Sequence, residues 1–76
     1  MDLFLMTISH RNTNDVQNFV FIDYASARRY CNELKKYSSL LNGFTVRRLR
    51  LNRASGVFDK VAVMYHIRFE DVVSSK

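Results

Sequence analysis

The side chains of this sequence with the clearest capacity for chemistry are four arginines set close together, Arg47, Arg48, Arg50 and Arg53. A guanidinium stays charged and carries a planar fork of N–H donors, so it can pair with both oxygens of a carboxylate or a phosphate. Charged side chains on a solvated strand that discourage edge-to-edge pairing are a simpler interpretation. Composition alone leaves protein binding, phosphate binding and a solvated strand open.

The charge balance of the chain favours an acidic partner. Twelve Lys and Arg face seven Asp and Glu in 76 residues, which gives a formal net charge of +5. Such a charge attracts nucleic acid or a negative protein surface. A second basic cluster lies upstream, at Arg28, Arg29, Lys35 and Lys36. Together with residues 47–53 this cluster could follow a phosphate backbone, so a basic nucleic-acid-binding domain is the alternative to a protein-binding strand.

Catalytic and metal-binding patterns are weak, and we expect no enzymatic activity, no metal and no cofactor. His66 lies beside Tyr65 near several arginines, a combination that small basic ribonucleases use, but a histidine on a solvated face explains it more simply. The histidines and the single cysteine lack metal-ligand spacing, and two glycines cannot form a phosphate-binding loop. Cys31 is expected to be a core thiol.

The elements that must position these side chains begin with a hairpin. Residues 3–10 and 19–24 alternate with a period of two around an Asn- and Asp-rich loop, which predicts two antiparallel strands. Apolar side chains lie on both faces of this hairpin: Leu3, Leu5, Phe19 and Phe21. Only one face can pack against a helix, so the other indicates a partner protein or a homodimer.

An amphipathic helix should follow the hairpin. Apolar residues recur at spacings of three and four from Ala27 to Leu41, while most basic residues fall on the opposite side. We expect a helix of about four to five turns, with Asp23 as its N-cap. Asn42 and Gly43 are expected to end it, because both tolerate the left-handed conformation common at helix termini.

Two further strands are predicted at 44–52 and 60–70, around a turn. In the later strand the odd-numbered residues alternate cleanly and should face the core. In the earlier strand the apolar residues change from even to odd numbers midway. A β-bulge near Arg47 and Arg48 would bring them back to one face, and a strand partly covered on both sides is the alternative.

This order of elements predicts an α+β fold, ββαββ, in which one amphipathic helix packs on a small antiparallel sheet. The 76 residues have room for a single domain, 1–76, and we expect the last few residues, 74–76, to be disordered. One cysteine, and no long apolar run near the start, predict a protein of the reducing cytoplasm that has no internal disulfide and is not membrane-bound.

The segment from Tyr24 to Arg50, about half of the chain, resembles without a gap the small inhibitor of bacterial RNA polymerase made by T7-like phages. Tyr37 stands where that family has a tryptophan. Residues of the first predicted strand also look like the family's first strand: Phe4, Thr7 and Ile8. The residues that match within the segment are Tyr24, Ala25, Glu33, Leu34, Gly43, Phe44, Val46, Arg48 and Arg50.

The resemblance implies a helix packed on a small antiparallel sheet, in a phage protein that acts in the cytoplasm of its bacterial host. It implies binding to the jaw of the polymerase β′ subunit, inhibition of open-complex formation, and a role for Arg48 and Arg50 in polymerase binding. The sequence departs from the family at Ser9, where the family has an acidic residue, and in its basic helix. It also adds a whole strand, 60–70, so another host protein or a nucleic acid is an alternative partner.

Overall fold

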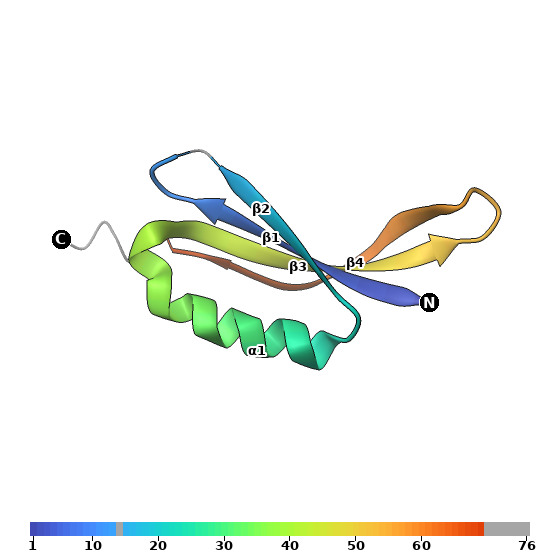
Figure 1. Cartoon of the computed structure of the whole chain (residues 1–76), viewed down its shortest axis with the longest axis horizontal. Coiled ribbons are helices and arrows are strands. Elements are labelled where there is room, and N and C mark those ends of the chain that lie inside the picture. The colour runs from blue at the N-terminus through green and yellow to red at the C-terminus, as the bar shows by residue number, and fades with distance from the viewer. Residues whose placement is uncertain (14, 70–76) are drawn as a thin grey trace.

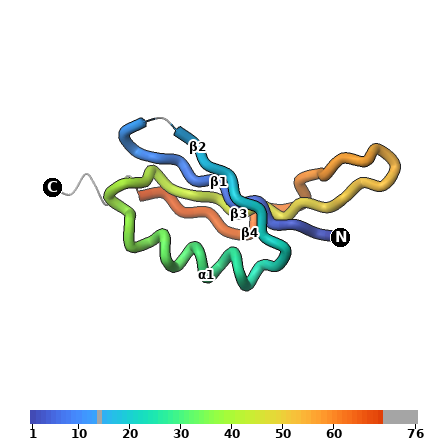
Figure 2. The backbone as a smooth tube through the Cα atoms, viewed as in Figure 1, coloured from blue at the N-terminus to red at the C-terminus, as the bar shows by residue number. Residues whose placement is uncertain are grey.

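The computed structural model describes residues 1–13 and 15–69 and confirms the α+β fold (Figures 1 and 2). One antiparallel sheet has the strand order β2-β1-β3-β4. Helix α1 (Tyr24–Leu34) runs on into a 3₁₀ segment, η1 (Lys35–Leu40), along one side of the sheet. The predicted disorder at 74–76 lies outside the described residues. The strands are β1 (Asp2–His10), β2 (Val16–Phe21), β3 (Leu41–Asn52) and β4 (Val57–Arg68).

The predicted hairpin is confirmed, with its second strand shifted toward the N-terminus. Strand β2 ends at Phe21, three residues before the predicted end, because Asp23 is the N-cap of the helix. The pairing is regular, with Met6 opposite Phe19 and Phe4 opposite Phe21. These four side chains point to the side of the sheet that α1 covers, which we call the helix face.

The N-cap of α1 is the predicted Asp23. The backbone N–H of Ser26 donates to Asp23 Oδ1 at 2.7 Å, and this hydrogen bond lowers the pKa of the Asp23 carboxyl. The predicted end of the helix is wrong. Regular α-helix stops at Leu34, and η1 continues only to Leu40. Asn42 and Gly43 belong to β3 instead of ending the helix.

The core lies between α1 and the two central strands. Met6 and Ile8 of β1 and Phe44 and Val46 of β3 are at most 2% exposed, as expected for alternate residues on one face of a sheet. From the helix side this core receives Ala27, Cys31 and Leu34. Burying each large apolar side chain stabilises the fold by roughly 1.5–3 kcal/mol, and this layer is the main source of stability.

The irregularity predicted at Arg47 and Arg48 exists, but the additional residues lie in the neighbouring strand. The register between β3 and β4 shifts on either side of this pair, leaving Met64 and Val61 of β4 without a partner in β3. Between Gly43 and Arg50, β3 pairs with β1 without a break. Strand β3 therefore keeps its alternation on the β1 side, and its apolar residues change face midway.

These shifts correct two predictions. Tyr65 and Ile67 pack against the core as expected, but Val61 and Val63 are 41% and 61% exposed, because each shift moves the alternation of β4 by one residue. Leu49 of β3 stays on the side of the sheet away from the helix. The alternative prediction, a strand partly covered on both sides, is met on one side only, because within the described residues α1 and η1 pack on the helix face and no element packs on the other.

The side chain of Arg11 forms hydrogen bonds with three separate segments of the chain. Its Nη2 donates to the carbonyl oxygen of Leu41 at 2.8 Å, and to those of Ser38 and Phe69 at 3.4 Å. The carbonyls at the end of a helix lack intrahelical partners, so a guanidinium is well suited to this position. Nothing in the spacing of the sequence indicates this role.

The β3–β4 hairpin extends beyond the first turn of α1, which gives the molecule dimensions of 51 × 24 × 16 Å (Figure 1). The helix therefore covers only part of the sheet. Arg48 and Arg50 lie on the extended part of β3, on the helix face but past the core.

Candidate functional site

The alternation of β3 divides the four predicted arginines. Arg48 and Arg50 lie on the helix face, on the parity of the buried Phe44 and Val46. Arg47 lies on the opposite side, which we call the open face and which carries the odd-numbered residues of β1 and β3. Arg53 is exposed in the turn between β3 and β4. The structure thus brings Arg48 and Arg50 together and separates both from Arg47.

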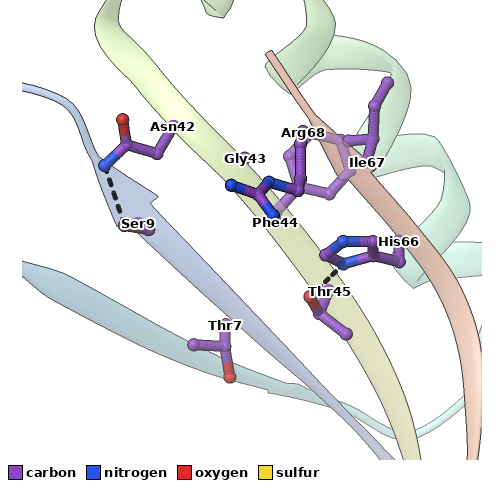
Figure 3. A pocket seen from close by; sticks show the side chains of 9 residues that line it. All are labelled: Thr7, Ser9, Asn42, Gly43, Phe44, Thr45, His66, Ile67 and Arg68. Carbon is purple, nitrogen blue, oxygen red and sulfur yellow. Dashed lines mark hydrogen bonds between the residues drawn. The ribbon is translucent and has the colours of Figure 1, made fainter. Parts of the chain in front are cut away.

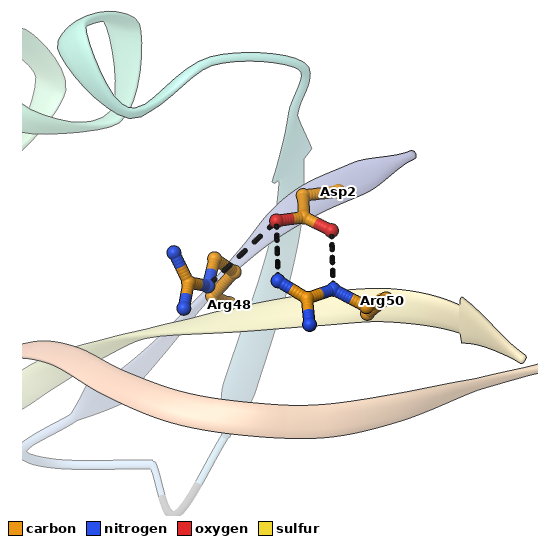
Figure 4. Close-up of polar contacts among 3 residues, drawn as sticks. All are labelled: Asp2, Arg48 and Arg50. Carbon is orange, nitrogen blue, oxygen red and sulfur yellow. Dashed lines mark hydrogen bonds and ion pairs between the residues drawn. The ribbon is translucent and has the colours of Figure 1, made fainter.

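Arg48 and Arg50 share a carboxylate that the sequence analysis missed, that of Asp2 (Figure 4). Arg50 donates from Nε to Asp2 Oδ1 at 3.1 Å and from Nη2 to Oδ2 at 3.4 Å, a forked contact. Arg48 Nε lies 3.8 Å from Asp2 Oδ2, close enough for an ion pair only. The signal that could have found Asp2 is the pairing of β1 with β3, which sets it directly opposite Arg50.

The electrostatics of this cluster follow from its geometry. The hydrogen bond from Arg50, reinforced by the positive charges of Arg50 and Arg48, lowers the pKa of the Asp2 carboxyl. The same hydrogen bond raises the pKa of Arg50. Two guanidiniums against one carboxylate leave one net positive charge.

Donor groups remain in this cluster for a further acceptor. The side chains of Arg48 and Arg50 are 33% and 56% exposed. Figure 4 shows the terminal nitrogens of Arg48 pointing away from Asp2. Because a guanidinium has five N–H donors and Asp2 takes few of them, a second carboxylate or a phosphate could bind beside Asp2.

The second basic cluster is dispersed around α1. Arg28 and Lys35 lie over the ring of Tyr65, with Arg28 Cζ at 4.1 Å and Lys35 Nζ at 5.4 Å from its centroid. Arg28 also donates to the hydroxyl of Tyr24 at 3.4 Å, which raises the pKa of Arg28. These two cations stack on a side chain of the protein itself.

The other two cations each follow one of these residues in the sequence and so point to a different side: Arg29 lies about 100° further round α1, and Lys36 lies in η1. Arg29 donates to Ser26 Oγ at 3.2 Å, and Lys36 pairs with Glu33 at 3.3 Å on the surface. The sheet lies between all four helix cations and Arg47. Arg48 and Arg50, by contrast, lie on the helix face together with α1, so the phosphate track from the helix to residues 47–53 stays a prediction for these two and excludes Arg47.

Aromatic side chains cluster on the helix face. Ring pairs lie at centroid distances of 5.7 Å for Phe4 and Tyr24, 5.5 Å for Phe19 and Tyr30, and 5.8 Å for Phe44 and Phe69. These rings fill the space between sheet and helix. Single-stranded bases need rings that face the solvent, and this arrangement offers few.

A depression of about 530 Å³ with both polar and apolar lining lies on the open face, at the end of the sheet away from Arg48 and Arg50 (Figure 3). We call it the Gly43 hollow, because Gly43 lies at its centre. Sequence reasoning missed it, since its residues come from β1, β3 and β4. The polar side chains that line it are Thr7, Ser9, Asn42, Thr45, His66 and Arg68.

Residues 1–13 and 15–69 contain neither a metal-binding cluster nor a membrane-spanning helix. In this part of the chain, no group of three or more His, Cys, Asp or Glu could hold a metal ion. No helix there is long and apolar enough to cross a membrane. Cys31 is fully buried on α1, and burial raises the pKa of its thiol.

Comparison with known proteins returned no family model, no curated protein and no solved structure that matches this chain. The likeness to the phage polymerase inhibitors therefore stays a prediction from the sequence.

Proposed function

We propose that this protein is a small binding protein that inhibits or redirects a host macromolecule by occupying an acidic surface through Arg48 and Arg50. The observation that carries the proposal is the shared carboxylate of Asp2. It shows that both guanidiniums reach one carboxylate from the same face of the sheet. The proposed action is occupation of a surface and needs no catalytic step, metal or cofactor.

The strand supports such binding because it fixes both side chains. Residues two apart on a strand lie about 7 Å from each other on the same face, a spacing at which two guanidiniums can grip neighbouring carboxylates. Strand β3 is paired on both sides, with β1 and with β4, so its backbone is rigid. Little conformational entropy is then lost on binding.

For the partner we propose bacterial RNA polymerase, in the cytoplasm of a phage host. This part of the proposal rests on the sequence resemblance, which includes both Arg48 and Arg50. The alternative, a nucleic-acid-binding domain, is favoured by the net charge of +5. It is disfavoured by the dispersed helix cations and by the packing of the aromatic rings in the core.

The test is affinity capture from bacterial lysate with the tagged protein, with and without nuclease treatment. The Arg48→Ala, Arg50→Ala double variant is compared with the wild type. The matched control is the Arg29→Ala, Lys36→Ala double variant, which removes the same charge from the exposed side of the helix. Circular dichroism verifies that all variants fold.

We expect a polymerase subunit to be retained after nuclease treatment, lost in the Arg48 and Arg50 variant, and kept in the control. Binding of purified polymerase should weaken only moderately as salt rises, since a mixed protein interface depends less on salt than a phosphate interface. Capture that nuclease abolishes would replace this proposal with nucleic-acid binding. Equal capture by all three proteins would remove Arg48 and Arg50 from the interface.

A further inference from the structure

The open face of the sheet carries charge of one sign. Its charged side chains, within the described residues, are Arg47, Lys60 and Arg68, as the register of β3 with β1 and β4 places them. The acidic residues of the strands, Asp2 and Asp59, fall on the other side. Within residues 1–13 and 15–69 this face thus carries basic groups and no acidic one, a charge that attracts an acidic partner and repels a basic one.

The centre of the Gly43 hollow exists because residue 43 has no side chain. A Cβ at this position would collide with the backbone carbonyl oxygen of Ile67 on β4, and the φ of +158° lies at the edge of the range that favours glycine. The close pairing of β3 with β4 therefore requires glycine. A consequence is a depression in the sheet surface between Ser9 and Arg68.

The walls of the hollow offer hydrogen-bond donors. Asn42 Nδ2 donates to Ser9 Oγ at 3.3 Å, which leaves the hydroxyl proton of Ser9 available to another acceptor. Thr45 Oγ1 and His66 Nδ1 form a hydrogen bond of 2.8 Å, which leaves the other ring nitrogen of His66 available (Figure 3). When Thr45 Oγ1 donates to His66 Nδ1, the ring carries its proton on Nε2, and this N–H and the Ser9 hydroxyl, beside basic residues, suit a carboxylate.

Beside the hollow, the open face becomes apolar. Val20, Leu5, Arg47 and Val63 form a row across all of the strands, as the pairings of β1 with β2 and of β3 with its two neighbours show. Val20 is 58% exposed and Val63 is 61% exposed. The next row toward the tip contains Leu3 and Leu49, directly opposite one another. Rows on one face are about 7 Å apart along the strands.

We propose that the open face is a docking surface for an acidic amphipathic protein segment. One carboxylate of this segment binds in the Gly43 hollow, and its apolar side chains pack on Leu5, Leu49, Val20 and Val63. The spacing of about 7 Å between rows is close to that of residues four apart on a helix. This surface lies across the sheet from Arg48 and Arg50, and the inference does not depend on the function proposed for them.

The same observations disfavour other occupants. A phosphate backbone has no apolar group to match the leucines and valines. The phenyl ring on this face, Phe58 opposite Leu51, lies near the tip of the β3–β4 hairpin, far from the hollow, so it offers bases no platform beside the hollow. A second copy of the chain would bring this basic patch against an identical basic patch, because a two-fold interface uses the same surface twice. Charge complementarity thus favours an acidic protein segment.

The experiment is an NMR titration of the isotope-labelled protein with an amphipathic helical peptide whose leucines run along one face, bordered by glutamates. Two further probes are the same peptide with every Glu replaced by Gln and a single-stranded oligonucleotide. The open-face variant is Val20→Ser with Val63→Ser, chosen because both side chains are already more than half exposed. The Arg48→Ala, Arg50→Ala protein is the control.

We expect the glutamate peptide to shift the amide signals of Thr7, Gly43, Thr45 and Leu49 in a saturable way. The Gln peptide and the serine variant should each weaken binding by about tenfold, and the Arg48 and Arg50 control should bind as the wild type does. No saturable binding, tighter binding of the oligonucleotide to this face, or shifts confined to Arg48 and Arg50 would overturn the inference. Shifts that depend on protein concentration alone would overturn it in favour of a second copy.

Discussion

The two faces of the sheet use the same strands in opposite ways. On the helix face, β1 and β3 contribute Met6 and Val46 to a sealed core, and further along they join Asp2 with Arg48 and Arg50. On the open face, the intervening residues leave an apolar surface with basic groups and the Gly43 hollow. Adjacent residues such as Arg47 and Arg48 therefore serve different surfaces. The residues that make up one surface are therefore those that share a face of the sheet, and not those that are neighbours in the sequence.

The largest expected difference between the faces concerns neighbouring residues of β1. Met6→Ala on the helix face should lower the free energy of unfolding by about 2–5 kcal/mol, because it opens a cavity in a sealed core. Leu5→Ala on the open face should lower it by only about 1 kcal/mol. Urea denaturation of both variants measures this. Equal losses would show that the open face is packed in the free protein.

Substitutions of the two glycines test whether β3 and β4 approach each other closely at the hollow. Gly43→Ala should lower the free energy of unfolding by about 3 kcal/mol, since the new Cβ meets the Ile67 carbonyl and must push β4 away. Gly56→Ala is the control, because Gly56 has a φ of +75° and open space around its Cβ position. It should cost only about 1 kcal/mol, from backbone strain alone. A harmless Gly43→Ala change would contradict the close approach of β3 and β4.

A smaller effect on stability is expected at the N-cap of α1, the helix that covers one face of the sheet. Asp23→Ala removes the acceptor for the Ser26 N–H and should lower the free energy of unfolding by about 1 kcal/mol. Asp23→Asn, which keeps an acceptor oxygen, should restore most of that loss. Thermal denaturation followed by circular dichroism compares the two variants with the wild type. The cap is unimportant if Ala and Asn behave alike.

The smallest expected effect belongs to Asp2 and varies with pH. Its pKa is lowered in the folded protein from the ordinary 3.8, so its stabilising contribution is present above that pH and is lost as the pH falls through the lowered value. Asp2→Asn should therefore lower the melting temperature slightly at neutral pH and not at all in strong acid. Salt should reduce the difference, since the pair is exposed. A pH-independent difference would point to a cause other than the charge of Asp2.

The sequence predicts the elements well because periodicity depends on local burial. The alternation in residues 3–10, the spacing of three and four from Ala27, and the capping residue Asp23 are all confirmed. The predicted helix end is wrong because Asn42 and Gly43, which are residue types common at helix termini, belong to β3, which pairs with its neighbouring strands. The prediction that Val61 and Val63 of β4 face the core is wrong. A register shift depends on how two strands pair, and it leaves no signal in the sequence of either strand alone.

The candidate sites are less predictable for the same reason. Arg48 and Arg50 are two residues apart, so a strand places them together without further information. Asp2 joins them only through the pairing of β1 with β3, and no local pattern reveals that register. The Gly43 hollow combines three strands and depends on a missing side chain. Local patterns thus locate the arginines, while their partners and the second surface depend on topology.

The hydrogen bonds of Arg11 have a consequence for folding kinetics. They span 27, 30 and 58 residues of the sequence, and they can form only after η1, β3 and the end of β4 have come together. Contacts that form late affect the rate of unfolding far more than the rate of folding. We therefore expect the loss of this one side chain in a loop to shorten the time that a molecule stays folded more than it slows folding.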